Sequence, residues 1–169
     1  MKNVVLNNDI NLTIPEGFVE ISGAEVQEMG VCKGPAPMWS MTNKEEHMLI
    51  TASWMKFGWL TSRMINAKDM AKAIRQKYNS KLKVKSMSGC TYGDIFETSL
   101  DGHKAYAFPC TYRAFTKDGE LVDMVHDTMV VKIGDMFYVF QAFYRDALKD
   151  RCINTVHEVY ESVQFAAAA

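Results

Sequence analysis

The stretch that most constrains the fold is the run MFYVFQAFY at residues 136–144. Successive side chains of a strand point to opposite faces, and here both alternating sets are apolar except at Gln141. A strand with one apolar face packs against one layer, whereas this strand has to be covered on both faces. We therefore predict an α+β fold: a three-layer α/β/α sandwich whose central, mostly antiparallel sheet is covered by helices on both faces.

Tight turns divide the preceding segment into further strands. Asp101-Gly102 is a strong hairpin signal, and the segments 117–120 and 134–135 supply two more turns. Together they predict an antiparallel meander with strands at residues 91–100, 104–115, 121–132 and 136–144. Pro109 has no N–H to donate, so a bulge or a sheet edge is expected there.

The remaining segments are interpreted as the first strands and the cover of this sheet. Ser22 with Glu25 forms a capping box for a short helix, and Asn66 and Asp146 are expected to cap two longer ones. The predicted helices are 22–29, 66–79 and 146–162, and the predicted strands are 4–6, 10–14, 38–42 and 47–57. Residues 58–65 are expected to be a connection, and residues 81–87 a strand or an extended link.

Length and charge bound the kind of protein. We expect one domain over residues 1–165, with the alanines at 166–169 as a tail or vector remnant. The 19 basic and 20 acidic residues give a net charge of -1, without the basic excess usual in nucleic-acid binding proteins. The lysines at 77, 81, 83 and 85 are interpreted as a solvated helix end. No apolar run is long enough to span a membrane.

The four cysteines, Cys32, Cys90, Cys110 and Cys152, form no CxxC pair. No basic-then-apolar leader is present at the N-terminus, so we expect reduced cysteines and a cytoplasmic location, unless a leader has been removed.

Motifs for catalysis are missing from the sequence. The histidines at 47, 103, 126 and 157 lack metal-ligand spacing, and no glycine pattern of a phosphate loop occurs. Cys110 and His126 lie on neighbouring predicted strands, where a thiolate beside an imidazolium would be a nucleophile. That pairing depends on the strand register, and the other interpretation is a core thiol and a half-buried histidine. We predict no catalytic, cofactor-binding or metal-binding residues and no enzymatic activity.

The connection after the long strand is unusually apolar for a loop. It contains Phe57, Trp59, Leu60 and Met64, and Trp39 is expected nearby. Exposed Trp, Leu and Met side chains often mark a partner site, since loops are otherwise polar. The alternative is that Trp59 and Leu60 fold back as a lid on the core. We take these five residues as candidate partner-binding residues and leave both interpretations open.

Four short motifs resemble those of a known family: IPEGF at 14–18, DGHKAY at 101–106, GDMFY at 134–138 and SVQF at 162–165. In this order, over residues 3–165, the chain resembles the PsbP-like family, which includes a photosystem subunit, a Ran-binding import factor and bacterial DcrB-type proteins. The resemblance implies an α/β/α sandwich and a role as adaptor, chaperone or extrinsic subunit, mostly without enzymatic activity. The chain departs from many DcrB-type proteins, which are lipoproteins, because it has no lipobox.

Two function hypotheses follow. The first is a non-enzymatic binding module, adaptor-like or chaperone-like, that engages a protein or an apolar peptide. The alternative is a small-molecule binder or cofactor-free enzyme with a pocket at a sheet end, to which Tyr92, Tyr106, Tyr112 and His126 would contribute. Homodimer formation stays open.

Overall fold

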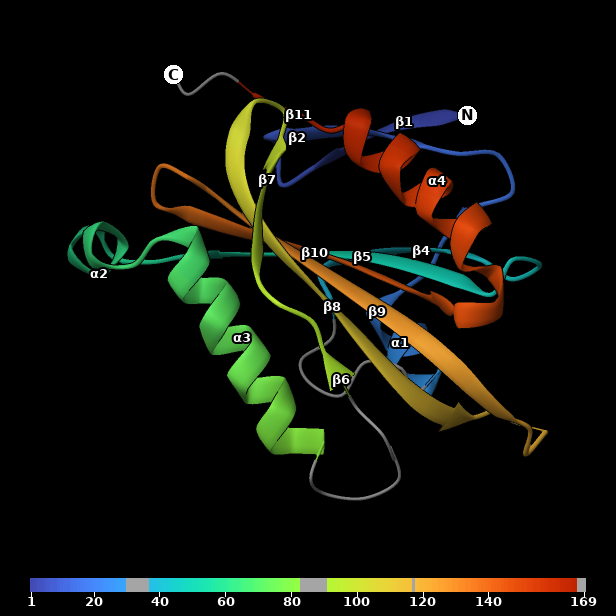
Figure 1. Ribbon diagram of the computed structural model, residues 1–169. Helices are drawn as coiled ribbons and strands as arrows, with labels where there is room; N and C mark the ends of the chain where they lie inside the picture. Colours follow the sequence, from blue (N-terminus) through green and yellow to red (C-terminus); the bar gives the residue numbers. More distant parts are fainter. Residues whose placement is uncertain (30–36, 83–90, 117, 167–169) are drawn as a thin grey trace.

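The computed structural model of the protein describes residues 1–29, 37–82, 91–116 and 118–166 (Figure 1). Its strands are β1 (Lys2–Leu6), β2 (Ile10–Ile14), β3 (Val19–Glu20), β4 (Trp39–Asn43), β5 (Met48–Lys56), β6 (Thr91–Tyr92), β7 (Phe96–Leu100), β8 (His103–Phe115), β9 (Leu121–Ile133), β10 (Met136–Arg145) and β11 (Gln164–Phe165). Its helices are α1 (Gly23–Met29), α2 (Trp59–Met64), α3 (Ala67–Leu82) and α4 (Lys149–Glu161), with a 3-10 turn, η1, at Asp146–Leu148.

The larger sheet has eight strands in the order β3-β4-β5-β10-β9-β8-β6, and β7 also pairs with β8. All of its strand pairs are antiparallel. The apolar run at residues 136–144 belongs to β10, which lies inside the sheet between β5 and β9. The predicted antiparallel meander is therefore confirmed, and β10 is its innermost part.

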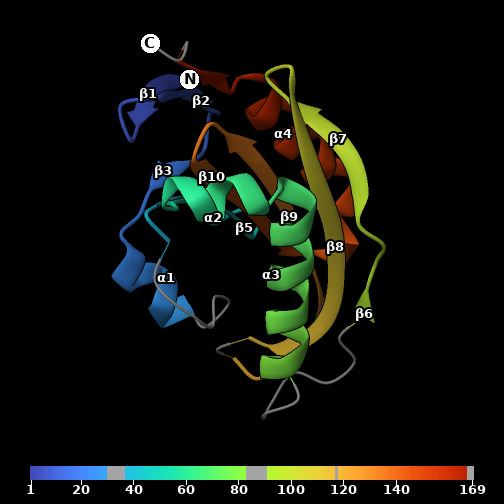
Figure 2. The ribbon, with the colours of Figure 1, turned by 90° about the vertical axis from the view of Figure 1, so that its left-hand side faces the viewer.

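Both faces of β10 are buried, as the sequence predicts. Phe137 and Val139 pack against α3 in one core, and Phe143 packs with Val26 of α1 on that same face. Tyr138 and Phe140 point the other way, into a larger core that includes α4. The three-layer arrangement is visible in Figures 1 and 2, with α1 and α3 on one side of the sheet and α4 on the other.

A second sheet also covers the α4 face. The strands predicted at 4–6 and 10–14 pair as a hairpin, β1 and β2, and β11 adds to the other edge of β2. Asn7 and Asn8 adopt φ values of 50° and 60°, the left-handed conformation that this turn requires. The Tyr138 hydroxyl donates to the Asp9 carboxylate and ties the turn to the large sheet.

Two of the predicted helix starts are confirmed by reciprocal caps. The Glu25 carboxylate accepts from the Ser22 N–H at 2.7 Å, and the Glu25 N–H donates to the Ser22 hydroxyl at 3.3 Å. Asn66 caps α3 in the same way, since its side-chain oxygen accepts from the Asp69 N–H at 2.9 Å. The cap expected at Asp146 is wrong, because this residue lies inside η1 and α4 begins after it without a side-chain cap.

Three further details differ from the sequence prediction. The strand expected at 91–100 is two strands, β6 and β7, because residues 93–95 stand opposite only Phe108 and Pro109 and form the bulge expected at Pro109. Lys81 and Leu82 belong to α3, and the rest of the link expected at 81–87 lies outside the described residues. Residues 59–64 form α2 instead of a loop. Within the described ranges, no helix has the length and apolar character needed to cross a membrane.

Candidate functional site

The five candidate partner residues do not form one surface. Trp39 and Phe57 lie on opposite faces of the sheet, and the other three lie on α2. Trp39 packs at the margin of the core on the α4 face, and its indole N–H donates to Glu20 at 2.9 Å. Phe57 packs on the α3 face, edge-on to Phe137 with ring centroids 5.3 Å apart. Trp39 and Phe57 therefore pack against the core and contribute little to an exposed surface.

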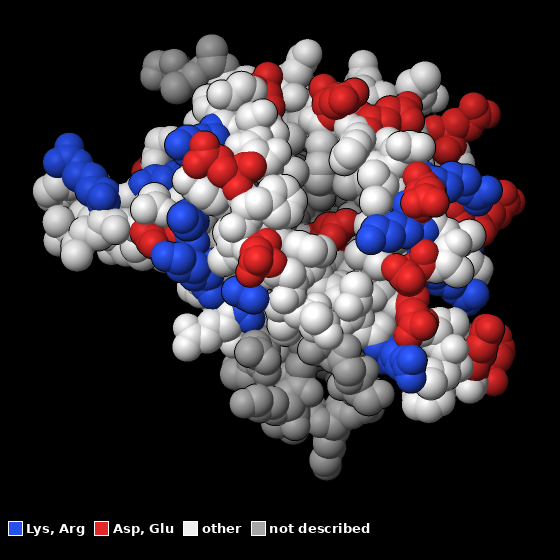
Figure 3. All heavy atoms as spheres, in the orientation of Figure 1, with Lys and Arg blue, Asp and Glu red and all other residues white. Residues whose placement is uncertain are grey.

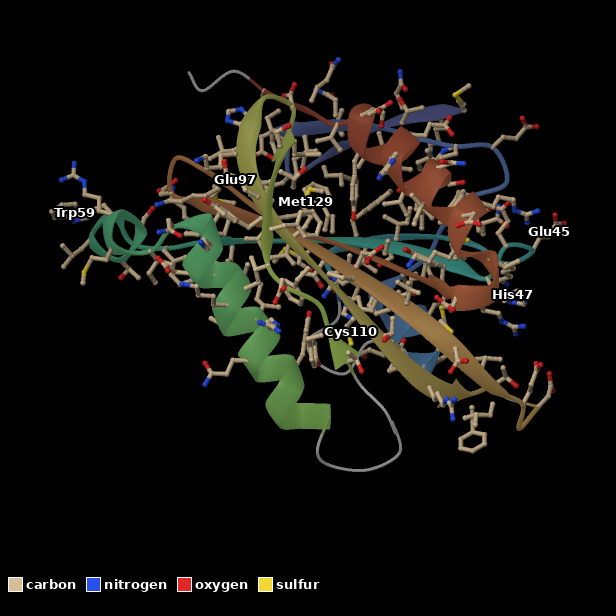
Figure 4. All side chains as sticks on the ribbon, viewed as in Figure 1. Glu45, His47, Trp59, Glu97, Cys110 and Met129 are labelled. Carbon is tan, nitrogen blue, oxygen red and sulfur yellow. The ribbon has the colours of Figure 1, made fainter. Side chains whose placement is uncertain are left out.

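The other three residues form one exposed apolar surface on α2. The side chains are 67% exposed at Trp59, 60% at Leu60 and 77% at Met64. Figure 4 shows Trp59 at the outer end of the molecule, on the side of α2 that points away from the sheet. We call these three residues the α2 knob. The alternative that Trp59 and Leu60 fold back as a lid on the core is therefore wrong, because both side chains are on the surface.

Contacts with the hairpin between β9 and β10 hold α2 in place. Lys132, on β9, donates to the carbonyl oxygens of Ser62 and Ile65, the latter at 2.9 Å. Ser62 is buried, and its hydroxyl lies 3.4 Å from the Gly134 carbonyl oxygen that accepts from it. These contacts involve the inner side of the helix and leave the knob exposed.

The strand before α2 is fastened to the same hairpin. The N–H of Phe57 donates to the Asp135 carbonyl oxygen at 3.2 Å, and the Lys56 ammonium lies 3.3 Å from the Asp135 carboxylate. A helix of six residues is marginal in isolation, and α2 has no side-chain N-cap. Its conformation therefore depends on tertiary contacts, and the knob is held on a fixed base.

The Cys110–His126 pair does occur in the strand register. Cys110 is directly opposite His126 on the neighbouring strand, so both side chains lie on the α3 face. His126 stacks on Phe143 with ring centroids 4.1 Å apart, and burial lowers the pKa of His126 to about 3. A neutral imidazole cannot stabilise a thiolate beside it at neutral pH. The pair therefore fits the interpretation of a core thiol and a packed histidine.

Asp127, next in sequence, points to the opposite face. Its carboxylate accepts from the Tyr144 hydroxyl at 2.5 Å, and burial raises the pKa of Asp127. Because their side chains point to opposite faces of the sheet, His126 and Asp127 cannot act as a dyad. Among the residues that the structure describes, no three His, Cys, Asp or Glu side chains converge on a metal site.

Sequence reasoning missed a buried polar row on the α3 face. Ser40, Thr51, Gln141 and Thr128 are aligned across β4, β5, β10 and β9 by consecutive register pairs. Ser40, Thr51 and Thr128 are buried, and the Gln141 amide donates to the Tyr78 hydroxyl of α3. Gln141, which interrupts the apolar pattern of residues 136–144, was the signal that could have located this row.

A second exposed apolar pair was also missed. Phe115 and Leu121 are opposite each other at the tip of the β8–β9 hairpin and are 68% and 48% exposed. The tip and α2 lie at opposite ends of the molecule in Figure 1. The pair offers a matched control for experiments on the knob, because it is apolar, exposed and distant.

These features define an α/β/α sandwich with a C-terminal helix over one face of the sheet and an exposed apolar helix, α2, at one end. Among the described residues, we find no metal-binding group and no activated nucleophile. The fold is the PsbP-like fold that the motifs predicted. It matches the solution structure of the cyanobacterial PsbP protein, CyanoP, from Synechocystis sp. PCC 6803, with a TM-score of 0.64 and 12% identity over 98% of this chain and 92% of that one.

Two other solved structures share the fold. The Ran-binding protein Mog1p of Saccharomyces cerevisiae matches with a TM-score of 0.56 and 11% identity, over 96% of this chain and 94% of that chain. LpqN of Mycobacterium tuberculosis, described as involved in cell envelope biogenesis, matches with a TM-score of 0.54 and 18% identity, over 94% of this chain and 83% of that chain. No protein-family model and no curated protein sequence matches the chain.

Proposed function

We propose that the protein is a non-enzymatic binding module, adaptor-like or chaperone-like, that docks a protein or peptide partner on the α2 knob. The observation that carries the proposal is the knob itself: Trp59, Leu60 and Met64 are exposed on a helix whose inner side is fastened to the sheet. Tryptophan is enriched among residues that dominate binding energy, and a pre-fixed surface lowers the entropy lost on binding.

The comparisons support the same class of function. One protein of this fold, Mog1p, is described as Ran-binding, so the fold is compatible with a protein partner. The surroundings of His126 also support a non-enzymatic role, because its imidazole is neutral and packs against the rings of Phe143 and Tyr78.

We also propose a cytoplasmic location, on the basis of the cysteine spacing. Cell fractionation tests this location.

Affinity capture with a matched control tests the docking surface. Wild-type protein is compared with Trp59→Ala, Leu60→Ala on the knob and with Phe115→Ala, Leu121→Ala at the distant hairpin tip. Both double variants remove one aromatic ring and one leucine from exposed positions. Partners identified by mass spectrometry should be lost with the first variant and retained with the second. Retention of every partner by both variants would exclude the knob.

The small-molecule alternative is favoured by one observation, the buried polar row. Ser40 has a buried hydroxyl oxygen with no hydrogen-bond partner, and it lies on the face that also carries Tyr92, Tyr106, Tyr112 and His126. A hollow of about 390 Å³ exists elsewhere; it is lined by Met1, Lys2 and residues 14–20 and by none of those four. Native mass spectrometry of the purified protein tests the alternative, which requires a retained ligand that Ser40→Ala releases.

A further inference from the structure

The segment that carries the knob is strongly basic although the chain is not. Residues 56–78 contain six basic side chains and one acidic one, Asp69, which gives +5. The whole chain has a net charge of -1, so the remaining residues together carry -6. In Figure 3, Lys and Arg side chains gather over α2 and α3, at the end where the knob lies. The apolar surface therefore sits inside a positive potential.

Most carboxylates at this end already have lysine partners. Asp135 lies 3.3 Å from Lys56, Asp69 lies 3.9 Å from Lys72, and Glu97 lies 3.1 Å from Lys104. The charges of these three carboxylates are thus balanced within the protein. The other basic side chains of residues 56–78 give a surplus of positive charge around the knob.

Two cations of the surplus lie on aromatic rings. The Arg63 guanidinium is 5.0 Å from the ring centroid of Trp59, and the Lys68 ammonium is 5.9 Å from that of Tyr106. Among the described residues neither forms an ion pair, although Lys68 also acts on Glu97 at longer range. Arg63 therefore offers guanidinium N–H groups directly beside the exposed indole of the knob.

Resting on the proposed function, we infer that the partner is an acidic, amphipathic protein segment, in which apolar side chains are flanked by Asp or Glu. The apolar side chains cover Trp59, Leu60 and Met64, and a carboxylate binds Arg63 in the bidentate geometry that guanidinium groups favour. The charge surplus also speeds encounter with a negatively charged partner and disfavours basic ones.

The arrangement fits a protein segment better than an anionic lipid surface. A flat anionic membrane is held by many unpaired cations at once, but Lys56 and Lys72 are already paired with Asp135 and Asp69. A protein segment places its few carboxylates beside Arg63 and Lys68 and avoids the paired acids. The knob also has only three apolar side chains, which is little area for membrane anchoring.

The test is a selection from a random-peptide phage library on four immobilised proteins. These are the wild type, the double variant Trp59→Ala, Leu60→Ala, the charge reversal Arg63→Glu, Lys68→Glu, and a matched reversal far away, Lys44→Glu, Lys149→Glu. All four exchanged basic side chains are exposed. The best wild-type peptide is then synthesised, and its affinity is measured for each protein. Circular dichroism melts confirm that each variant is folded. Binding of the proteins to phosphatidylcholine vesicles with and without phosphatidylglycerol is measured in parallel.

We expect wild-type protein and the distant reversal to select peptides rich in Asp or Glu together with apolar residues. Affinity for the synthesised peptide should fall about tenfold or more with Arg63→Glu, Lys68→Glu and should weaken with added salt. Selected peptides that depend on Trp59 but carry no acidic excess would overturn this inference and leave the proposed function standing. Absence of any peptide that depends on Trp59 would count against both. Knob-dependent binding to the anionic vesicles alone would make the surface a lipid site instead.

Discussion

The ammonium group of Lys132, on β9, donates a hydrogen bond of 2.9 Å to the Ile65 carbonyl oxygen just after α2. Through this contact a residue of the sheet binds the C-cap residue of α2, which lies 67 positions earlier in the chain. A cation at the C-terminal end of a helix also stabilises it through the helix dipole. Together with the contacts of Ser62 and Phe57 to the same hairpin, this bond holds the base of the knob against the sheet.

Replacing Lys132 tests that attachment. Lys132→Met keeps the length of the side chain but removes the donor, and hydrogen bonds to charged groups contribute about 1.5–3 kcal/mol. We expect faster hydrogen exchange at the amides of Ser62 and Ile65, which close the turns of α2. Lys44→Met, which removes an exposed lysine in the turn between β4 and β5, is the control. Unchanged protection in α2 would show that Lys132 is dispensable.

Phe140→Ala tests the central position of β10. Phe140 is 2% exposed in the core beneath α4, and truncating such a ring costs about 3–5 kcal/mol of unfolding free energy. Phe96→Ala, at an exposed ring on β7, should change stability by less than about 0.5 kcal/mol. Denaturant melts measure both. A loss at Phe140 under about 1 kcal/mol would contradict the central role of this strand.

His126 makes stability depend on pH in a defined direction. Its pKa falls from 6.5 to about 3 in the folded protein, because burial disfavours the imidazolium. Below pH 6.5 the imidazole of His126 binds a proton in the unfolded chain but not in the folded protein. The free energy of unfolding therefore decreases as the pH falls toward 3. This contribution has a slope of about 1.4 kcal/mol per pH unit. His126→Phe should remove that part of the slope in denaturant melts between these pH values, and equal slopes would contradict the assignment.

Gly93 tests the bulge opposite Pro109. A Cβ at Gly93 would lie 2.6 Å from Pro109 Cγ, and the Gly93 N–H donates to the Pro109 carbonyl oxygen at 2.9 Å. Gly93→Ala should therefore cost about 1–3 kcal/mol, the usual range for overpacking. Gly58→Ala is the control, because nothing lies within 4 Å of a Cβ there and its φ of -56° suits any residue. Equal thermal stability of the two variants would rule out the steric argument.

Local patterns were sufficient for the sheet. The alternation of β10, the Asp101-Gly102 turn and the cap at Asn66 act over a few residues, and all three are present in the structure. The α2 helix was missed because its stability comes from Lys132, a contact that no local pattern shows. The second sheet was missed for the same reason, since β11 pairs with β2 from the other end of the chain.

The candidate site was only partly predictable. Hydrophobicity identified Trp59, Leu60 and Met64, but it could not separate them from Phe57, whose ring turns inward against Phe137. The Cys110–His126 pair shows the converse: the register allowed it, and burial makes the histidine neutral. Whether a side chain near the end of a strand is exposed depends on what packs over it, and that is a property of the whole fold.

The pairing of β11 with β2 has a practical consequence for presenting the molecule. β1 and β11 lie on either side of β2 in the small sheet, but the chain enters and leaves this sheet at opposite ends, since Lys2 pairs with Ile14 and Phe165 with Ile10 (Figure 1). The N-terminus lies on the side of the molecule away from α2 in Figure 1, so a tag or solid support attached there would leave the knob facing solution.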